Sequence, residues 1–281
     1  GIINGTSNFI LSEMREKGAA FADILEQAQQ LGYAEADPTF DVEGHDAGHK
    51  ITIMSALAFG TPFNFDACYL EGISHLDSRD IRYAEELGYR IKLLGITRRT
   101  DKGIELRVHP TLLPECRLLA NVNGVMNAVR VKADMVGETM YYGPGAGALP
   151  TASAVVADII DICRLLDADA ENRVPLLGFQ ADEVQDISFL PIDDITSSYY
   201  LRVRAADETG VLAAISAILA KYGVSIEALI QKSVHDGSHA EIVILTHTTV
   251  ERSIKSAIAE IEQMQTVFKP VVMIRMESLH G

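Results

Sequence analysis

Residues 199–223 read YYLRVRAADETGVLAAISAILAKYG, and this stretch decides the fold of the C-terminal part of the chain. In its first eight residues, aromatic and apolar side chains alternate with Arg202 and Arg204, which is typical of a strand. Beyond the turn residues 207–210, apolar side chains recur at the spacing of one helix face. They are Val211, Leu212, Ile215, Ile218, Leu219 and Tyr222. The stretch therefore predicts a strand that leads into an amphipathic helix.

The segments that follow complete a regular unit. SIEALIQKSV and HAEIVILTHT predict two strands joined by a hairpin turn at Asp236-Gly237. TVERSIKSAIAEIEQM then predicts a helix, and PVVMIRME predicts a last strand. The order βαββαβ is the ferredoxin-like arrangement, and we assign it to residues 198–281.

Upstream of this unit, helical and hairpin patterns occur together. Thr6 or Ser7 is expected to cap a first helix that Gly18 ends, and a second helix is expected to end at Gly32. YRIKLLGITRR with GIELRVHP predicts one hairpin, and NAVRVKADM with GETMYY predicts another. Such hairpins build a mostly antiparallel sheet with helices on one face, so the fold class is α+β.

Length and charge suggest where the chain divides. A chain of 281 residues suggests about two domains. Residues 1–195 carry 16 basic and 30 acidic side chains, whereas residues 196–281 carry eight and nine. We therefore expect a domain at 1–170, an Asp-rich connector with little regular structure at 171–197, and the C-terminal unit at 198–281.

The composition excludes several classes of protein. A net charge of −15 and a pI near 4.9 argue against a nucleic-acid partner, because phosphate binding needs basic clusters. No apolar run approaches the roughly twenty residues of a membrane span. The three cysteines show no CxxC pattern, so neither a disulfide framework nor a cysteine-rich zinc site is indicated. A reducing cytoplasm fits this pattern.

Residues 32–50, GYAEADPTFDVEGHDAGHK, concentrate acidic side chains between glycines and a proline. The next fifteen residues, ITIMSALAFGTPFNF, carry no charge and predict a helix buried on nearly every side. The acidic stretch is therefore expected to be a loop before a buried helix. Lys50 at its end needs a partner, because an unpaired buried ammonium is costly. Asp46, four residues earlier, lies on the same helix face.

Two interpretations of this stretch stay open on spacing alone. In an enzyme, the carboxylates of Glu35, Asp41 and Asp46 can hold the ammonium group of a small substrate while Lys50 donates or accepts a proton. In a structural interpretation, the same groups form salt bridges that pin two helices together.

Two weaker patterns accompany the stretch. His45 and His49 have the four-residue spacing of zinc-binding histidines, but no glutamate fills the general-base position and Gly48 weakens a helix, so we expect surface histidines and no metal site. The turn GPGAG at 143–147 precedes a predicted helix and could face an anion. Its proline departs from GxGxxG, so we interpret it as a close-packed turn beside a cofactor, without a complete dinucleotide-binding fold.

The acidic stretch resembles the signature of the homoserine dehydrogenase family. The residues at the family's fixed spacings are Gly32, Asp37, Pro38, Asp41, Gly44, Asp46 and Lys50. GIINGTSNFI and GPGAGALPTASAVVADI resemble the flanking motifs of that family, and residues 198–281 resemble an ACT domain, a βαββαβ module that binds amino acids. The resemblance covers essentially the whole chain.

The resemblance implies an oxidoreductase that interconverts homoserine and aspartate 4-semialdehyde in threonine, isoleucine and methionine biosynthesis. It implies that Lys50 donates a proton to the substrate oxygen and that Asp46 holds Lys50 or relays the proton. It also implies that Glu35 receives the substrate ammonium, helped by Asp41 and the backbone around Tyr33.

Further roles follow from the same resemblance. Gly5 and Thr6 are expected to line the substrate, with Thr6 also on the nicotinamide side, and Gly145 is expected to approach the cofactor. The ACT effector loop is expected to bind an amino acid, with threonine as the best candidate. Its residues are Asp207, Gly210, Val211 and Leu212.

The family's Rossmann domain, which binds most of the cofactor, NADP or NAD, has no counterpart in these 281 residues. The chain alone is therefore expected to be inactive, and the full enzyme is expected to be a cytoplasmic homodimer or homotetramer. A second interpretation stays open, in which the chain is a non-catalytic fragment for amino-acid binding, regulation or dimerisation.

Overall fold

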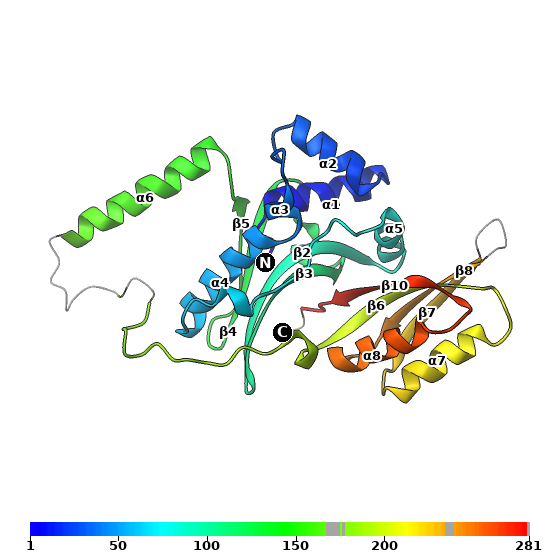
Figure 1. Cartoon of the computed structure of the whole chain (residues 1–281). Helices are drawn as coiled ribbons and strands as arrows, with labels where there is room; N and C mark the ends of the chain where they lie inside the picture. Colours follow the sequence, from blue (N-terminus) through cyan, green and yellow to red (C-terminus); the bar gives the residue numbers. More distant parts are fainter. Residues whose placement is uncertain (167–174, 176–177, 234–238, 280–281) are drawn as a thin grey trace.

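The computed structural model describes residues 1–166, 175, 178–233 and 239–279 (Figure 1). Its α-helices are α1 (Gly5–Lys17), α2 (Phe21–Gln30), α3 (Thr39–Val42), α4 (His45–Phe59), α5 (Ser78–Glu86), α6 (Ala148–Leu166), α7 (Val211–Lys221) and α8 (Glu251–Ile261). Its strands are β1 (Tyr69–Leu70), β2 (Tyr89–Thr100), β3 (Gly103–Pro114), β4 (Met126–Ala133), β5 (Gly137–Pro144), β6 (Thr196–Ala205), β7 (Ile226–Ser233), β8 (Ala240–Thr246), β9 (Thr249–Val250) and β10 (Val267–Met276). Short 3-10 turns are η1 (Phe65–Ala67), η2 (Leu118–Asn121) and η4 (Ile192–Asp194). The expected turn at Asp236-Gly237 and parts of the expected connector, 171–174 and 176–177, lie outside the described residues.

One eight-stranded sheet runs through the molecule in the order β1-β3-β10-β6-β8-β7, with β2 paired to β3 and β9 to β6. Most of its pairings are antiparallel, while β1 and β10 run parallel to β3. The second predicted hairpin, β4 with β5, forms a separate two-stranded sheet. The α+β class with a mostly antiparallel sheet is confirmed, and so are both N-terminal hairpins.

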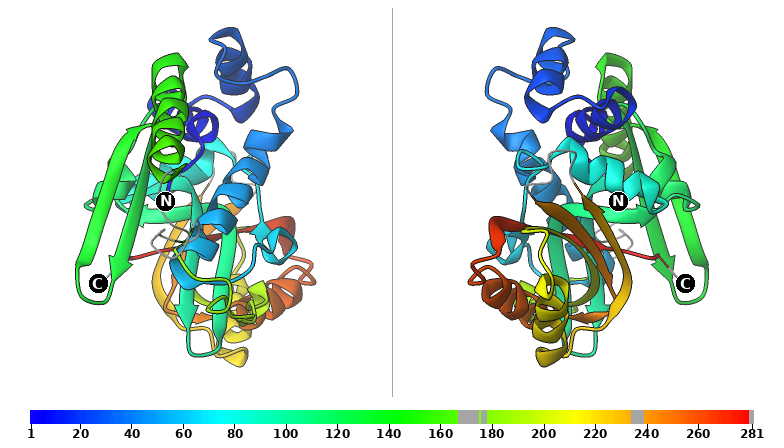
Figure 2. Two further views of the ribbon diagram at one scale, coloured as in Figure 1. Left: turned by 90° about the vertical axis from the view of Figure 1, so that its left-hand side faces the viewer. Right: turned by 90° about the vertical axis from the view of Figure 1, so that its right-hand side faces the viewer.

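The C-terminal unit has the predicted βαββαβ order, and β6 shows how its two faces are used. Tyr199, Leu201 and Val203 point to the side of α7 and α8 and share a buried cluster with them. Tyr200, on the opposite face, belongs to the cluster of the N-terminal part and donates a hydrogen bond to Asp80 of α5 at 2.8 Å. The strands of the C-terminal unit are therefore covered by α7 and α8 on one face and by the N-terminal part on the other (Figure 2).

The two parts of the chain are also joined edge to edge. In β10, Arg275 and Met276 pair in parallel with Thr111 and Leu112 of β3. One hydrophobic cluster accordingly contains Ile73 and Val108 together with Ile274 and residues of β8. The domain limits at 170 and 198 remain a prediction.

Three local expectations were wrong. The cap of α1 is Asn4, whose side chain accepts from the Ser7 amide, because the chain turns two residues earlier than Thr6 and Ser7 suggest. The acidic stretch is largely helical, since α3 and the start of α4 lie within it. Residues after Lys50 are not buried on every side: Ile53 is 49% exposed and Leu57 is 46% exposed.

The long helix α6 forms after the GPGAG turn as predicted. Its apolar side chains are exposed along the whole helix, with Val155, Ile159, Ile162 and Leu166 between 53% and 69% exposed. In Figure 1 the helix stands apart from the sheet. Among the described residues, no helix is long and apolar enough to span a membrane.

A buried ion pair holds α5 against the C-terminal unit. Arg202 of β6 donates to Asp80 from Nε at 2.6 Å and from Nη2 at 2.8 Å, and both side chains are under 5% exposed. Without Asp80, Arg202 keeps only the longer contact to Glu241 at 3.5 Å among the ion pairs of the described residues, and a poorly compensated buried charge costs more than the pair gains.

We therefore expect Asp80→Ala to lower the free energy of unfolding by about 3–5 kcal/mol. Urea unfolding followed by circular dichroism measures it. The control is Asp161→Ala, because Asp161 pairs with Arg164 on the exposed surface of α6. Its midpoint should hardly move. Equal shifts in the two variants would contradict the assignment.

Candidate functional site

Asn4 lies at the centre of the candidate site and is 6% exposed. Its side-chain oxygen accepts from the Ser7 amide at 2.8 Å, which caps α1. Its side-chain nitrogen donates to Asp41 at 2.7 Å and to Asp46 at 2.9 Å. One amide thus fixes two carboxylates from α3 and α4 against the start of α1.

Lys50 is held at the same point. Its Nζ donates to Asp46 Oδ2 at 2.7 Å and to the Ile3 carbonyl at 3.1 Å. Its side chain is 45% exposed, so the ammonium is oriented but still open to solvent. The predicted pairing of Asp46 with Lys50 across one helical turn is present, and of the two expected environments of Lys50, buried or half-buried, the exposed fraction of its side chain fits only the half-buried one.

The local sequence explains why α4 can present these groups. Gly44 has a φ of 84° and starts the helix, a conformation that side chains rarely adopt. Gly48 lies where a Cβ would be 2.7 Å from Leu70 and 3.0 Å from the Phe65 ring. The glycines therefore let α4 begin sharply and pack closely, and the helix then points Asp46 and Lys50 toward α1.

Thr6 and Tyr33 form a second contact beside this cluster. The Thr6 hydroxyl donates to the Tyr33 carbonyl at 2.7 Å, and the Tyr33 ring packs edge-on against Phe9 at 4.9 Å between centroids. Glu35 follows in the exposed loop, where its backbone carbonyl accepts from Gln29. Among the described residues, no hydrogen bond or ion pair reaches the Glu35 carboxylate. Glu35 is therefore near Tyr33 in the chain but is not joined to the Asp41–Lys50 cluster.

Asp37 belongs to the acidic stretch, but its hydrogen bonds give it a structural role at the start of α3. It accepts from the Thr39 hydroxyl at 2.6 Å and from the Thr39 amide at 3.1 Å. These hydrogen bonds lower the pKa of Asp37 below its ordinary value. The residue therefore shapes the entry into α3.

The start of α1 packs against the loop of residues 122–126. A Cβ on Gly5 would lie 2.9 Å from the Val125 carbonyl, so this position requires glycine. Lys92, which is 1% exposed, donates to the Val122 carbonyl at 2.6 Å and to Asn8 of α1 at 3.1 Å. Burial, followed by the charge of Arg15, lowers the pKa of Lys92 to about 7. The sequence analysis did not identify Lys92.

His45 and His49 take part in a row of stacked rings. His49 stacks on Phe65 with 3.9 Å between ring centroids, and Phe40 stacks on both histidines at 5.7 and 6.2 Å. Among residues that the structure describes, no group of three His, Cys, Asp or Glu side chains could hold a metal ion.

The glycine turn and the proposed effector loop have different surroundings. A Cβ on Gly145 would lie 2.0 Å from the side-chain nitrogen of Asn127, so close packing favours glycine at this position. Gly210 has a φ of 93° and nothing within 4 Å of the place where a Cβ would lie, so the start of α7 is open. Asp207 accepts from Gln231 at 3.3 Å. Val211 is buried and Leu212 is partly buried against the same core, and the Val211 amide donates to the Glu208 carbonyl at 3.4 Å.

A cavity of about 330 Å³ lies elsewhere, between residues 66–70 and 190–195. Its wall includes Tyr69, Leu106 and the buried Arg107. The acidic cluster instead lies on an open face of the chain, where Asp41 and Asp46 are partly exposed and Lys50 is exposed.

The cluster has the parts that proton transfer to a polar substrate needs. A lysine with a fixed ammonium can donate a proton, and carboxylates beside it can attract a cationic group. Sequence reasoning missed Asn4, which fixes both carboxylates. The signal was an asparagine directly before the helix that Gly5 begins, since Asn is a preferred N-cap residue.

Comparison with known protein families identifies two regions. Residues 1–160 match the family model "Homoserine dehydrogenase", and residues 199–265 match the ACT domain. The chain is 77% identical over 280 residues to a homoserine dehydrogenase of Neisseria gonorrhoeae and 57% identical over 281 residues to one of Pseudomonas aeruginosa. These alignments cover 100% of this chain but only 64% and 65% of those relatives.

Solved structures give the same result. A homoserine dehydrogenase from Thiobacillus denitrificans superposes with a TM-score of 0.94 at 60% identity, over 99% of this chain and 63% of that one. A homoserine dehydrogenase from S. aureus superposes with a TM-score of 0.74 at 30% identity, over 99% of this chain and 64% of that one.

The central position of Asn4 can be tested by Asn4→Asp. This change keeps a capping oxygen but places a third carboxylate between Asp41 and Asp46, where two donated hydrogen bonds are lost. We expect a loss of about 1–3 kcal/mol in the free energy of unfolding at pH 7. The negative charges of Asp41 and Asp46 should raise the pKa of the carboxyl group introduced at position 4 in the folded state. The loss in the free energy of unfolding should therefore shrink as pH falls toward about 4, where this group becomes protonated.

Urea unfolding at pH 7.5 and 4.5 measures this difference. The control is Asn64→Asp, since Asn64 caps η1 through Ala67 and donates to no carboxylate among the described residues. A deficit of Asn4→Asp that is independent of pH would rule out the three-carboxylate explanation.

Proposed function

Because this chain belongs to the homoserine dehydrogenase family, we propose that it forms the substrate-binding and regulatory parts of an enzyme that interconverts L-homoserine and L-aspartate 4-semialdehyde. The chain spans 64% of the length of the N. gonorrhoeae relative, so the activity is proposed for the full-length protein. The observation that carries the proposal is the cluster in which Asn4 fixes Asp41 and Asp46, and Asp46 fixes Lys50.

In this proposal Lys50 is the general acid. Reduction of the aldehyde adds a hydride to its carbon and a proton to its oxygen, and Lys50 Nζ donates that proton. In the oxidative direction the same nitrogen accepts the hydroxyl proton. Asp46, at 2.7 Å, and the Ile3 carbonyl, at 3.1 Å, orient the ammonium. A positioned group of this kind typically contributes 10²- to 10⁴-fold to the rate.

Carboxylates are proposed to hold the amino-acid end of the substrate. Glu35 is exposed and would pair with the substrate ammonium, helped by Asp41 and by the backbone near Tyr33. Gly5 and Thr6 would line the other side, because both lie at the start of α1 beside Asn4. The Thr6 hydroxyl, which donates to the Tyr33 carbonyl, would keep this wall in place.

NADP or NAD supplies or accepts the hydride when bound. The packing of Gly145 against Asn127 gives no independent support to a cofactor contact at that turn. We propose that parts of the full-length protein outside these 281 residues bind most of the cofactor. The proposed reaction belongs to threonine, isoleucine and methionine biosynthesis, and we propose that the enzyme is a cytoplasmic homodimer or homotetramer.

Regulation is proposed at the loop 207–212 before α7. The open start of α7 offers helix N-terminal amides, which favour a carboxylate. A free amino acid fits such a site, and threonine, an end product of the pathway, is the proposed effector.

Lys50→Ala in the full-length enzyme should lower kcat by at least about 10²-fold with the fold intact. Steady-state rates with homoserine and circular dichroism check this result. The control is Lys17→Ala, because Lys17 pairs with Glu13 across one helical turn and is also 45% exposed. If Lys50→Ala kept the kcat of the control, the cluster would be structural.

Gly210→Val should abolish inhibition by threonine and leave the uninhibited rate nearly unchanged. The new side chain would fill the space beside the amides of α7. The control is Gly223→Val, since Gly223 ends the same helix with a φ of 71° and also has nothing within 4 Å of a Cβ. The control therefore imposes similar backbone strain. Initial rates across a threonine series decide the matter, and equal inhibition of both variants would exclude this loop.

A further inference from the structure

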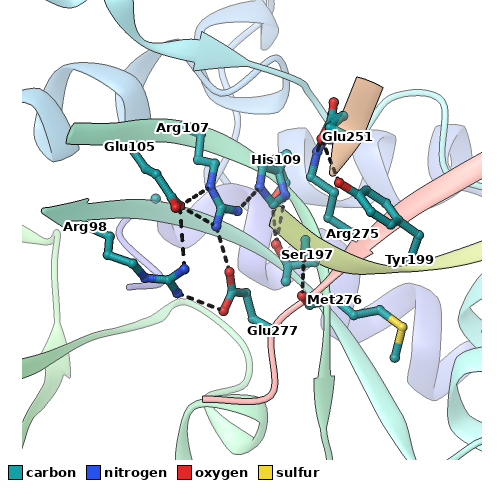
Figure 3. Close-up of polar contacts among 12 residues, drawn as sticks. Arg98, Glu105, Arg107, His109, Ser197, Tyr199, Glu251, Arg275, Met276 and Glu277 are labelled. Carbon is teal, nitrogen blue, oxygen red and sulfur yellow. Dashed lines mark hydrogen bonds and ion pairs between the residues drawn. The ribbon is translucent and has the colours of Figure 1, made fainter. Parts of the chain in front are cut away.

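Arg275 connects the C-terminal unit to the N-terminal part through buried charges. Its side chain is 1% exposed. Its Nε and Nη2 donate to Glu251 of α8 at 2.7 and 2.5 Å, and its Nη1 donates to Glu71 at 2.6 Å. Figure 3 shows Arg275 beside Glu251 and Tyr199. The guanidinium therefore bridges an acid of α8 and the acid that follows β1.

Glu71 is fixed on several sides. Its amide donates to the Val108 carbonyl at 2.9 Å, and its carboxylate accepts from Tyr69 at 2.9 Å. Burial opposes its ionisation, but the hydrogen bond with His75 and the charge of Arg275 outweigh burial and lower the pKa of Glu71 to about 2. Glu71 is thus a carboxylate at neutral pH, and removing Arg275 would leave it without its buried cation.

The backbone after Glu71 contacts residues 41–50 of the acidic stretch, called the acidic segment below. The Ile73 amide donates to the Val42 carbonyl at 2.8 Å. A Cβ on Gly72 would be 2.6 Å from the same carbonyl and 2.6 Å from the Glu43 Cα, so the two backbones are in contact. Val42 and Glu43 stand between Asp41 and the start of α4, which carries Asp46 and Lys50.

We propose that Arg275 and Glu71 are positioning residues that link α8 of the C-terminal unit to the acidic segment. In this link Arg275 fixes Glu71, and residues 71–73 in turn fix residues 42–44. The link rests on the proposed function only for its effect on catalysis. It offers a route by which a change in the C-terminal unit reaches Asp41 and Asp46, because a shift of Arg275 moves the support of the segment. The Asp80–Arg202 pair joins the same two parts but ends on α5.

The test uses the full-length enzyme and three isosteric changes. Glu71→Gln weakens the link at the acidic segment, and Glu251→Gln weakens it from α8. The control is Glu277→Gln, because Glu277 is also bound by a buried arginine, Arg107, at 2.7 Å, but contacts none of residues 41–50 in the hydrogen bonds described.

Hydrogen exchange of the peptide that covers residues 41–50 gives a readout that needs no activity. We expect exchange there to be at least about tenfold faster in Glu71→Gln and Glu251→Gln than in the wild type, and unchanged in Glu277→Gln. A merely structural role of these acids would accelerate exchange in all three variants or only beside each substitution. Unchanged exchange at 41–50 in Glu251→Gln, or an equal increase in Glu277→Gln, would overturn the proposal.

Kinetics with homoserine separate this proposal from the proposed function. If the wild type converts homoserine, Glu71→Gln and Glu251→Gln should lower kcat/KM at least about fivefold, while the control stays within twofold. A kcat/KM that is unchanged in both variants would contradict the coupling to catalysis. A wild type that does not convert homoserine would refute the proposed function, and the exchange result would then decide the link by itself.

Discussion

Three segments that lie far apart in the sequence pair with the same edge of β3, and the rest of the structure depends on this constraint. Phe189 lies beside Ile104, β1 lies beside Arg107 and Val108, and β10 lies beside Thr111 and Leu112. Because buried backbone groups must be paired, the position of each segment limits the position of the next one along the edge. The strand that leads into the contacts with the acidic segment, β1, and the last strand of the C-terminal unit, β10, are therefore both paired with β3.

Charges buried beside this edge make the arrangement specific. Arg107 donates to Glu105 and Glu277 (Figure 3), and Arg275 donates to Glu71 and Glu251. A buried ion pair adds little to stability compared with apolar packing, but any arrangement that separates its partners is strongly disfavoured. The network thus selects one way of joining the two parts, while the apolar clusters supply most of the driving force.

The sequence predicted what depends on local pattern. Periodicity located the βαββαβ order, and the four-residue spacing placed Asp46 beside Lys50. It could not predict the pairing of β10 with β3, because neither strand carries a local signal for a partner so far away in the chain. The sequence also carried no sign of the role of Asn4 at the site. A helix cap can be read from sequence, but the contacts of Asn4 with Asp41 and Asp46 depend on α1, α3 and α4 coming together. The exposed face of α4 escaped prediction because an uncharged run does not reveal which side is covered.

The shared edge also sets an order of events during synthesis. Residues 104–112 leave the ribosome long before residues 275 and 276, and at about 5–20 residues per second the delay is on the order of ten seconds. Through that interval, β1 is already made and can cover Arg107 and Val108, but Thr111 and Leu112 present an unpaired strand edge. A nascent chain therefore carries a temporary site for wrong strand pairing, and the arrival of β10 is the step that removes it.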